Sequence, residues 1–229
     1  MSHATANDPQ RGLEAILRRS PVMPVVVIDD AAQAVPLARA LLAGGIRSIE
    51  ITLRTPAALD AIRAVCAGVP EMATGAGTVL GGADLEAAAR AGAHFAVSPG
   101  STPVLLAAAT GHALPWLPGA ATASEVMALR EAGYRLLKFF PAAAAGGAAL
   151  LKSLHGPLPD VRFCPTGGIS VESAPAWLAL PNVVCVGGSW LTPGDRLRAA
   201  DWGAIEALAR QGGGAAPVMG GAAGPQRSR

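Results

Sequence analysis

Lysine is rare in this chain, and one of its two lysines interrupts an apolar segment. Lys138 lies within Leu136-Leu137-Lys138-Phe139-Phe140-Pro141, whereas the other basic positions, Lys152 apart, are arginines. Burial disfavours a charged ammonium group, and a neutral amine is a nucleophile that forms Schiff bases with carbonyl compounds. A lysine that extends its amine to water or pairs with an acid would instead be structural. Other residues must decide between these two readings.

Residues 48–54 alternate between apolar and polar side chains. Glu50, Thr52 and Arg54 therefore share one face of a β-strand, and the isoleucines and the leucine share the other. If the apolar face packs on helices, then Glu50 and Arg54 face the interior, as Lys138 does. Charges in an aliphatic interior are costly unless they are paired or used, and a buried ion pair seldom adds net stability. We therefore interpret these residues as a site.

Glycines follow three of the β-type segments. Gly167-Gly168 and Gly188-Ser189 follow the last two, where barrel loops commonly bind phosphate through backbone N–H groups. Gly75-Ala76-Gly77-Thr78 suits an anion such as a carboxylate, although a tight strand end would look the same.

The elements that must position these residues alternate along the chain. β-type segments are predicted at residues 23–28, 48–54, 72–79, 94–99, 114–119, 136–141, 162–167 and 183–189, and helices between them, for example at 31–43, 56–67, 83–91, 122–132 and 171–180. This alternation is typical of an α/β fold, a (β/α)8 TIM barrel, with an extra N-terminal helix at 11–19. A doubly wound sheet is disfavoured because no glycine follows the first strand, Val26-Val27-Ile28-Asp29-Asp30.

Composition narrows the class of protein. The chain has 229 residues, 51% of them hydrophobic, and a net charge of +2 without a basic block, so we expect no nucleic-acid partner. Three scattered cysteines, a polar start and apolar runs too short to span a membrane favour a cytoplasmic protein. No motif requires a metal or an organic cofactor. We predict one domain over residues 11–210, between disordered ends at 1–10 and 211–229.

Six segments together resemble one enzyme family, the 2-keto-3-deoxy-6-phosphogluconate (KDPG) and 4-hydroxy-2-oxoglutarate (KHG) aldolases. They are Ile49–Thr55, Gly75–Leu80, Ser98–Gly100, Lys138–Ala142, Arg162–Ile169 and Gly187–Trp190. The resemblance covers residues 11–210. It implies a class I, metal-independent lyase with a barrel fold, assembled as a homotrimer, that acts on a phosphorylated 2-oxo acid. The implied products are pyruvate and glyceraldehyde 3-phosphate, or pyruvate and glyoxylate from 4-hydroxy-2-oxoglutarate.

The resemblance also implies a role for each matching residue. Lys138 would form the Schiff base, and Glu50 would transfer protons. The substrate would be held at its carboxylate and phosphate ends by Arg54, Thr78, Pro99, Phe140, Gly167, Gly168, Gly188 and Ser189.

One segment departs from the family pattern. Ala143-Ala144-Ala145 stands where the family commonly has Glu-Ala-Asn, so the substrate preference is left open. Two other functions also remain open from the residues alone. One is a phosphate-binding barrel isomerase that forms no covalent intermediate, and the other is a barrel that binds a phosphorylated ligand without catalysis.

Overall fold

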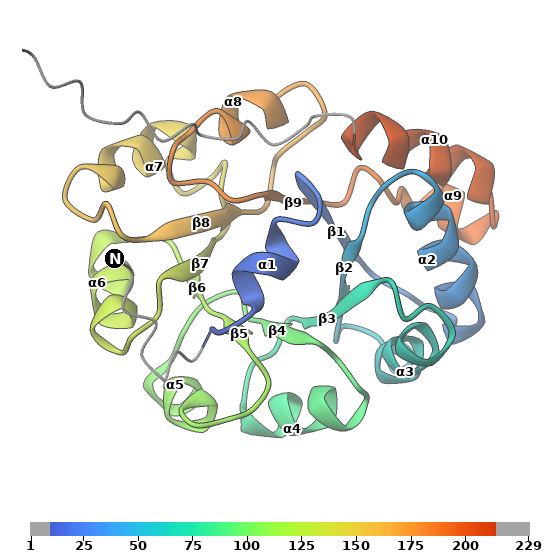
Figure 1. The fold of residues 1–229 in the computed structure, drawn as a ribbon, viewed down its shortest axis with the longest axis horizontal. Helices are drawn as coiled ribbons and strands as arrows, with labels where there is room; N and C mark the ends of the chain where they lie inside the picture. Colours follow the sequence, from blue (N-terminus) through green and yellow to red (C-terminus); the bar gives the residue numbers. More distant parts are fainter. Residues whose placement is uncertain (1–9, 214–229) are drawn as a thin grey trace, which may run out of the picture.

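The computed structural model describes residues 10–213, which fold as a curled sheet of short parallel strands with helices around it (Figure 1). The strands are β1 (Val22–Val26), β2 (Ser48–Thr52), β3 (Ala73–Gly77), β4 (Phe95–Val97), β5 (Trp116–Leu117), β6 (Gly119–Ala120), β7 (Leu136–Phe139), β8 (Arg162–Pro165) and β9 (Val186–Gly188). Six of them pair in the order β5-β4-β3-β2-β1-β9, and three in the order β6-β7-β8. The predicted α/β class with a parallel sheet is confirmed.

Pro118 divides one predicted strand, residues 114–119, into β5 and β6. Proline has no N–H to donate to a ladder. Its carbonyl still accepts a hydrogen bond of 2.8 Å from the Lys138 N–H, so the chain stays beside β7. At the other side, bridges between Phe163 and Val183 and between Thr166 and Gly187 join β8 to the chain around β9.

Most helices lie outside the curled sheet, and α1 lies across its middle (Figure 1). They are α1 (Leu13–Leu17), α2 (Ala34–Ala43), α3 (Ala58–Gly68), α4 (Gly82–Arg90), α5 (Pro103–Ala109), α6 (Ala123–Glu131), α7 (Gly147–His155), α8 (Ala174–Leu178), α9 (Gly194–Arg198) and α10 (Trp202–Gly213), with a 3-10 turn η1 (Ala31–Gln33) before α2. A capping box in which the Thr122 and Glu125 side chains bond to each other's backbone N–H groups begins α6.

Apolar side chains form a layer on each side of the sheet. Ile49 and Ile51 belong to the larger cluster, which includes the buried residues of the surrounding helices. Leu13 and Leu17 of α1 belong to the smaller cluster, together with strand residues such as Met23. The predicted alternation is therefore confirmed for residues 48–52, where the isoleucines pack toward the helices and Glu50 is left for the interior. It does not extend to Arg54, which was predicted to face inward but lies beyond the end of β2 and is exposed.

Both ends of the described chain are more ordered than the sequence suggests. Gln10, predicted to be in the disordered start, is buried, and its side-chain nitrogen donates to the carbonyl groups of Trp116 and Leu136. Its oxygen accepts from the N–H groups of Arg135 and Leu136. At the other end, α10 continues through residues 211–213, where the tail was predicted to begin. Residues 1–9 and 214–229, the rest of the two predicted disordered segments, lie outside the described residues.

Candidate active site

Lys138 and Glu50 meet inside the curled sheet. The Lys138 Nζ atom donates a hydrogen bond of 3.1 Å to Glu50 Oε1, and the two side chains are 6% and 0% exposed. The second carboxylate oxygen, Oε2, is also buried and has no hydrogen-bond partner in residues 10–213. One oxygen therefore holds the amine, and the other can accept a proton from a ligand beside it.

The contact joins two strands that are not neighbours. Glu50 is in the middle of β2, which pairs with β1 and β3, whereas Lys138 belongs to β7, which pairs with β6 and β8. The side chains reach each other across the interior because the sheet curls. The sequence predicted that both would face inward, and the structure confirms that they form a pair.

Phe140 and Pro99 lie near the lysine's strand. The ring centroid of Phe140 is 5.3 Å from Lys138 Nζ, within the range in which an aromatic face attracts a cation. Gly119 is the register partner of Lys138, and a methyl group there would overlap the Pro99 carbonyl group. A methyl group at Gly167 would lie 3.3 Å from the Phe140 ring. These contacts bring the ends of β4, β7 and β8 together around the lysine.

The glycines after β8 and in β9 have different structural roles. Gly167 and Gly168 have φ angles of 103° and 73°, in the left-handed region that favours glycine, so their loop turns with its backbone accessible. Gly188, in contrast, provides clearance: a methyl group there would lie 2.5 Å from Cη2 of the Trp190 ring and closer still to other ring atoms. Ser189 follows Gly188 directly and is exposed.

Arg54 and Thr78 lie beyond the ends of β2 and β3, two adjacent parallel strands. The predicted strand 48–54 ends earlier, at Thr52, whose carbonyl accepts a hydrogen bond of 2.8 Å from the Arg54 N–H. The Arg54 side chain is exposed and forms no ion pair with any of residues 10–213. Thr78 is half-buried with φ of 60°. Neither side chain is hydrogen-bonded to Lys138 or Glu50 within the described chain.

The predicted anion loop at 75–78 is largely strand. Gly75 and Gly77 belong to β3 and face interior side chains. A methyl group at Gly75 would lie 2.7 Å from Cδ2 of the Phe95 ring and closer still to other ring atoms, and one at Gly77 would overlap Glu50. These glycines therefore provide space for neighbours, and Thr78 follows directly after the strand.

Sequence reasoning did not single out Thr166, which the structure places in the interior. Its side chain is buried, its hydroxyl group donates to the Cys164 carbonyl at 3.4 Å, and a methyl group at Gly187 would lie 3.0 Å from its Cγ2 atom. The sequence could have revealed it, because Thr166 lies two residues after Cys164 and so shares its face of the chain, and Cys164 is the register partner of Lys138.

Two cysteines lie in the interior close to the lysine's strand. The Sγ atoms of Cys164 and Cys185 are 3.5 Å apart, and both side chains are fully buried. The hydrogen bond with Cys164, together with burial, raises the pKa of the Cys185 thiol well above its usual value. Both cysteines therefore pack as small core residues.

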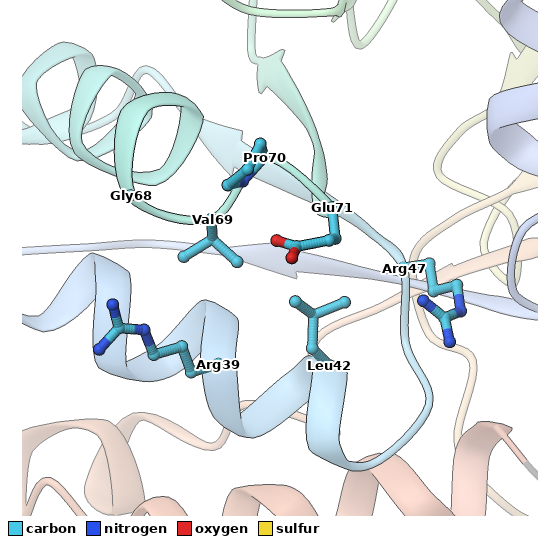
Figure 2. A pocket seen from close by; sticks show the side chains of 7 residues that line it. All are labelled: Arg39, Leu42, Arg47, Gly68, Val69, Pro70 and Glu71. Atoms are coloured by element: carbon cyan, nitrogen blue, oxygen red, sulfur yellow. The ribbon is translucent and has the colours of Figure 1, made fainter.

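The cavity in Figure 2 lies at the other end of the strands. It has a volume of about 420 Å³ and is lined by Arg39, Leu42, Arg47, Gly68, Val69, Pro70 and Glu71. Arg47 and Glu71 precede β2 and β3, whereas Arg54 and Thr78 follow them. This cavity is therefore separate from the lysine site.

No group of three histidine, cysteine, aspartate or glutamate side chains in residues 10–213 is arranged to hold a metal ion. None of the helices in that range is long and apolar enough to cross a bilayer.

Comparisons with known proteins point to one family. The family model for KDPG and KHG aldolases matches residues 13–208. The KHG/KDPG aldolase of Escherichia coli K12 is 51% identical over 198 residues, which are 86% of this chain and 93% of the relative.

Two solved structures are similar in both sequence and fold. The KDPG aldolase of Legionella pneumophila, with pyruvate captured as a covalent carbinolamine intermediate, is 45% identical with a TM-score of 0.86, over 87% of this chain and 97% of that one. The KDPG aldolase of Zymomonas mobilis ZM4, with 3-phosphoglycerate, is 45% identical with a TM-score of 0.85, over 90% and 99% of the two chains.

Proposed function

The chain belongs to the KDPG and KHG aldolase family, and we propose that it is a class I aldolase that cleaves 2-keto-3-deoxy-6-phosphogluconate to pyruvate and glyceraldehyde 3-phosphate. The same chemistry would cleave 4-hydroxy-2-oxoglutarate to pyruvate and glyoxylate. The observation that carries the proposal is the buried contact between Lys138 and Glu50, with one glutamate oxygen on the amine and the other without a hydrogen-bond partner among residues 10–213.

Lys138 acts as the nucleophile in this proposal. Its amine adds to the C2 carbonyl of the substrate to give a carbinolamine, and loss of water gives a protonated imine. The imine accepts the electron pair of the C3–C4 bond, which breaks as the C4 hydroxyl group loses its proton. An aldehyde leaves, and an enamine of pyruvate remains on Lys138. The covalent carbinolamine of the Legionella relative supports this sequence of steps.

Glu50 moves the protons. Oε2 can accept the C4 hydroxyl proton, directly or through a water, while Oε1 stays beside the Lys138 nitrogen, which is now part of the imine. The same carboxyl group can later supply the proton that converts the enamine to the imine of pyruvate. Hydrolysis of that imine regenerates Lys138.

The substrate's carboxylate end is assigned to Arg54 and Thr78, which follow adjacent strands at one edge of the sheet. Arg54 has a guanidinium group without an ion pair among residues 10–213, and such a group suits a carboxylate. Phe140, whose ring lies near Lys138 Nζ, and Pro99, whose carbonyl group lies against Gly119 on the neighbouring strand, are assigned to the walls of the site.

The phosphate end is assigned to the loops after β8 and β9. Gly167 and Gly168 turn in the left-handed region, and the bridge between Thr166 and Gly187 places the ends of the two strands next to each other. Backbone N–H groups there, with those of Gly188 and the Ser189 hydroxyl group, can donate to phosphate oxygens. The phosphorylated compound in the Zymomonas relative is consistent with such a binding end.

We also propose that the curled sheet is a closed (β/α)8 barrel, formed by one domain over residues 11–210. Pro118 keeps β5 and β6 on one continuous path, and the Phe163–Val183 and Thr166–Gly187 bridges join β8 to the chain around β9. The α1 helix would then cover the amino-terminal end of the barrel through Leu13 and Leu17. Family resemblance further suggests a cytoplasmic homotrimer, and light scattering of the purified chain would test the trimeric state.

The function is tested by borohydride reduction in the presence of pyruvate, followed by peptide mapping. Imine formation predicts a reduced pyruvate adduct on Lys138 and none on Lys152, the other lysine, which is exposed on α7. Lys152 thus serves as an internal control for non-specific reaction. A folded chain that turns over substrate without an adduct on Lys138 would exclude the Schiff-base mechanism.

The same experiment separates the two other functions that the residues leave open. A non-covalent isomerase would convert a phosphorylated sugar but resist borohydride. A ligand-binding barrel would bind the phosphorylated compound and release neither pyruvate nor an aldehyde. Coupled detection of pyruvate separates the aldolase from the other two, and conversion of a phosphorylated sugar separates the isomerase from the ligand-binding barrel.

A further inference from the structure

We propose that Gly77 is a positioning residue for Glu50: because it has no side chain, the carboxylate can remain on the Lys138 amine. This inference rests on the proposed function, in which Glu50 transfers protons. It adds a residue that has no side chain to contact the amine or the substrate and that would act through Glu50.

The space beside Gly77 is occupied by the glutamate. Gly77 is the register partner of Thr52, two residues along β2 from Glu50. A methyl group at Gly77 would lie 2.6 Å from Cγ and 2.8 Å from Cδ of Glu50, and closer still to Oε1. Carbon atoms essentially never approach so closely in proteins, so any side chain at position 77 must displace the carboxylate.

Displacement of the carboxylate would disturb its contact with the amine. Glu50 is completely buried, and Oε1 is the atom that accepts the 3.1 Å hydrogen bond from Lys138. The atom closest to the added methyl group is therefore the one that orients the amine. Rotation of the side chain would move both oxygens, including Oε2, which the proposed proton transfer uses.

The backbone does not require glycine at this position. Gly77 is not among the glycines with positive φ, so alanine can adopt its conformation. Alanine would also restrict the unfolded chain more than glycine does, which by itself favours folding. What excludes a side chain here is therefore the glutamate and not the turn after β3.

Gly75 provides a matched control in the same strand. Gly75 is the register partner of Glu50, but the three atoms nearest to a methyl group there all belong to the Phe95 ring, with Cδ2 at 2.7 Å and two others closer still. Gly75→Ala therefore disturbs interior packing to a similar degree, with its closest overlap on Phe95 and not on the carboxylate. Any effect specific to Gly77→Ala can then be attributed to Glu50.

The test compares Gly77→Ala and Gly75→Ala, each with Glu50 intact and with Glu50→Gln, in the full chain. The readouts are aldol cleavage and exchange of the pyruvate methyl protons with deuterium, which reports proton transfer on the enamine. General acid–base catalysis contributes about 100- to 10,000-fold, so we expect Gly77→Ala to lower kcat and the exchange rate by about 10- to 1,000-fold. In the Glu50→Gln background the same substitution should change them by less than about 2-fold, because the proton-transfer function is already lost.

Equal losses from Gly77→Ala in both backgrounds, or no loss in either, would overturn the proposal. Gly75→Ala should cause the same loss with and without Glu50→Gln. If Gly77→Ala does not fold, the Tm of Glu50→Ala is compared with that of Glu50→Ala combined with Gly77→Ala. The inference requires the two Tm values to be equal, because the glutamate side chain that the methyl group would overlap is then absent. Failure of the proposed function is distinguishable, because the unchanged chain would then give no borohydride adduct on Lys138.

Discussion

Lys138→Met should destabilise the protein, although methionine fits the same space. The substitution removes the hydrogen-bond partner of Glu50 Oε1, while Oε2 already has none in residues 10–213. The carboxylate is completely buried, so it would be left without a counter-charge. Removing one member of a buried ion pair costs about 3–5 kcal/mol.

A chain of this size loses roughly 2–4 °C in Tm for each kcal/mol, so the expected fall in Tm is about 6–20 °C. Glu50→Gln combined with Lys138→Met removes both charges and should recover most of this loss, because a neutral buried pair no longer carries the desolvation cost. Lys152→Met, on the exposed surface of α7, is the matched control and should change the free energy of unfolding by less than about 0.5 kcal/mol.

Urea denaturation at pH 7, followed by circular dichroism and tryptophan fluorescence at one fixed protein concentration, measures these differences. Fixed concentration matters because assembly between copies would add to the apparent stability. A Lys138→Met variant as stable as the unchanged chain would refute the reasoning, since Glu50 could not then be desolvated as the structure shows. A double variant no more stable than Lys138→Met would show that lost packing, and not the unpaired charge, causes the effect.

Three further outcomes are expected. Gln10→Ala should lower the free energy of unfolding by about 1–3 kcal/mol in urea denaturation, because buried backbone groups at the starts of β5 and β7 lose their partner. The pKa of Glu125 is lowered, chiefly by the hydrogen bond from the Ala121 N–H. Its contribution to stability is therefore complete above its ordinary pKa of 4.5 and is lost as the pH falls through the lower pKa of the folded state. In a series of Tm values measured against pH, Glu125→Gln should make the fall of Tm at acid pH less steep. A thiol reagent should leave Cys164 and Cys185 unmodified in the native protein and react with both in urea, whereas fast native reaction would contradict their complete burial.

Helices and strands were predicted well where the residues of a single segment mark its ends. The helix predicted at residues 31–43 ends where α2 ends, because an alanine- and leucine-rich run stops at Gly44-Gly45. Strand ends were predicted too long, at Arg54 among others, because alternation continues past the last ladder hydrogen bond. The division of β5 from β6 was missed, since pairing to β4 on one side and β7 on the other is not encoded in residues 114–119 alone.

The ends of the chain illustrate a second limit. Gln10 lies in a polar segment without periodicity, which predicts disorder. Its order comes from backbone groups more than 100 residues away in the sequence, at Trp116 and Leu136. Only the folded sheet brings unpaired carbonyl and N–H groups to this position.

The sequence by itself determined the class of fold, the family and the inward direction of Lys138 and Glu50, because alternation along a strand is a local property of the backbone. Only the tertiary structure decided that these two charges meet at 3.1 Å and that one glutamate oxygen has no hydrogen-bond partner within the described part of the chain. It also separated glycines that turn the chain, such as Gly167, from Gly77, which makes room for a neighbour. The physical reason is that distances across the interior depend on how strands far apart in the sequence curl around it.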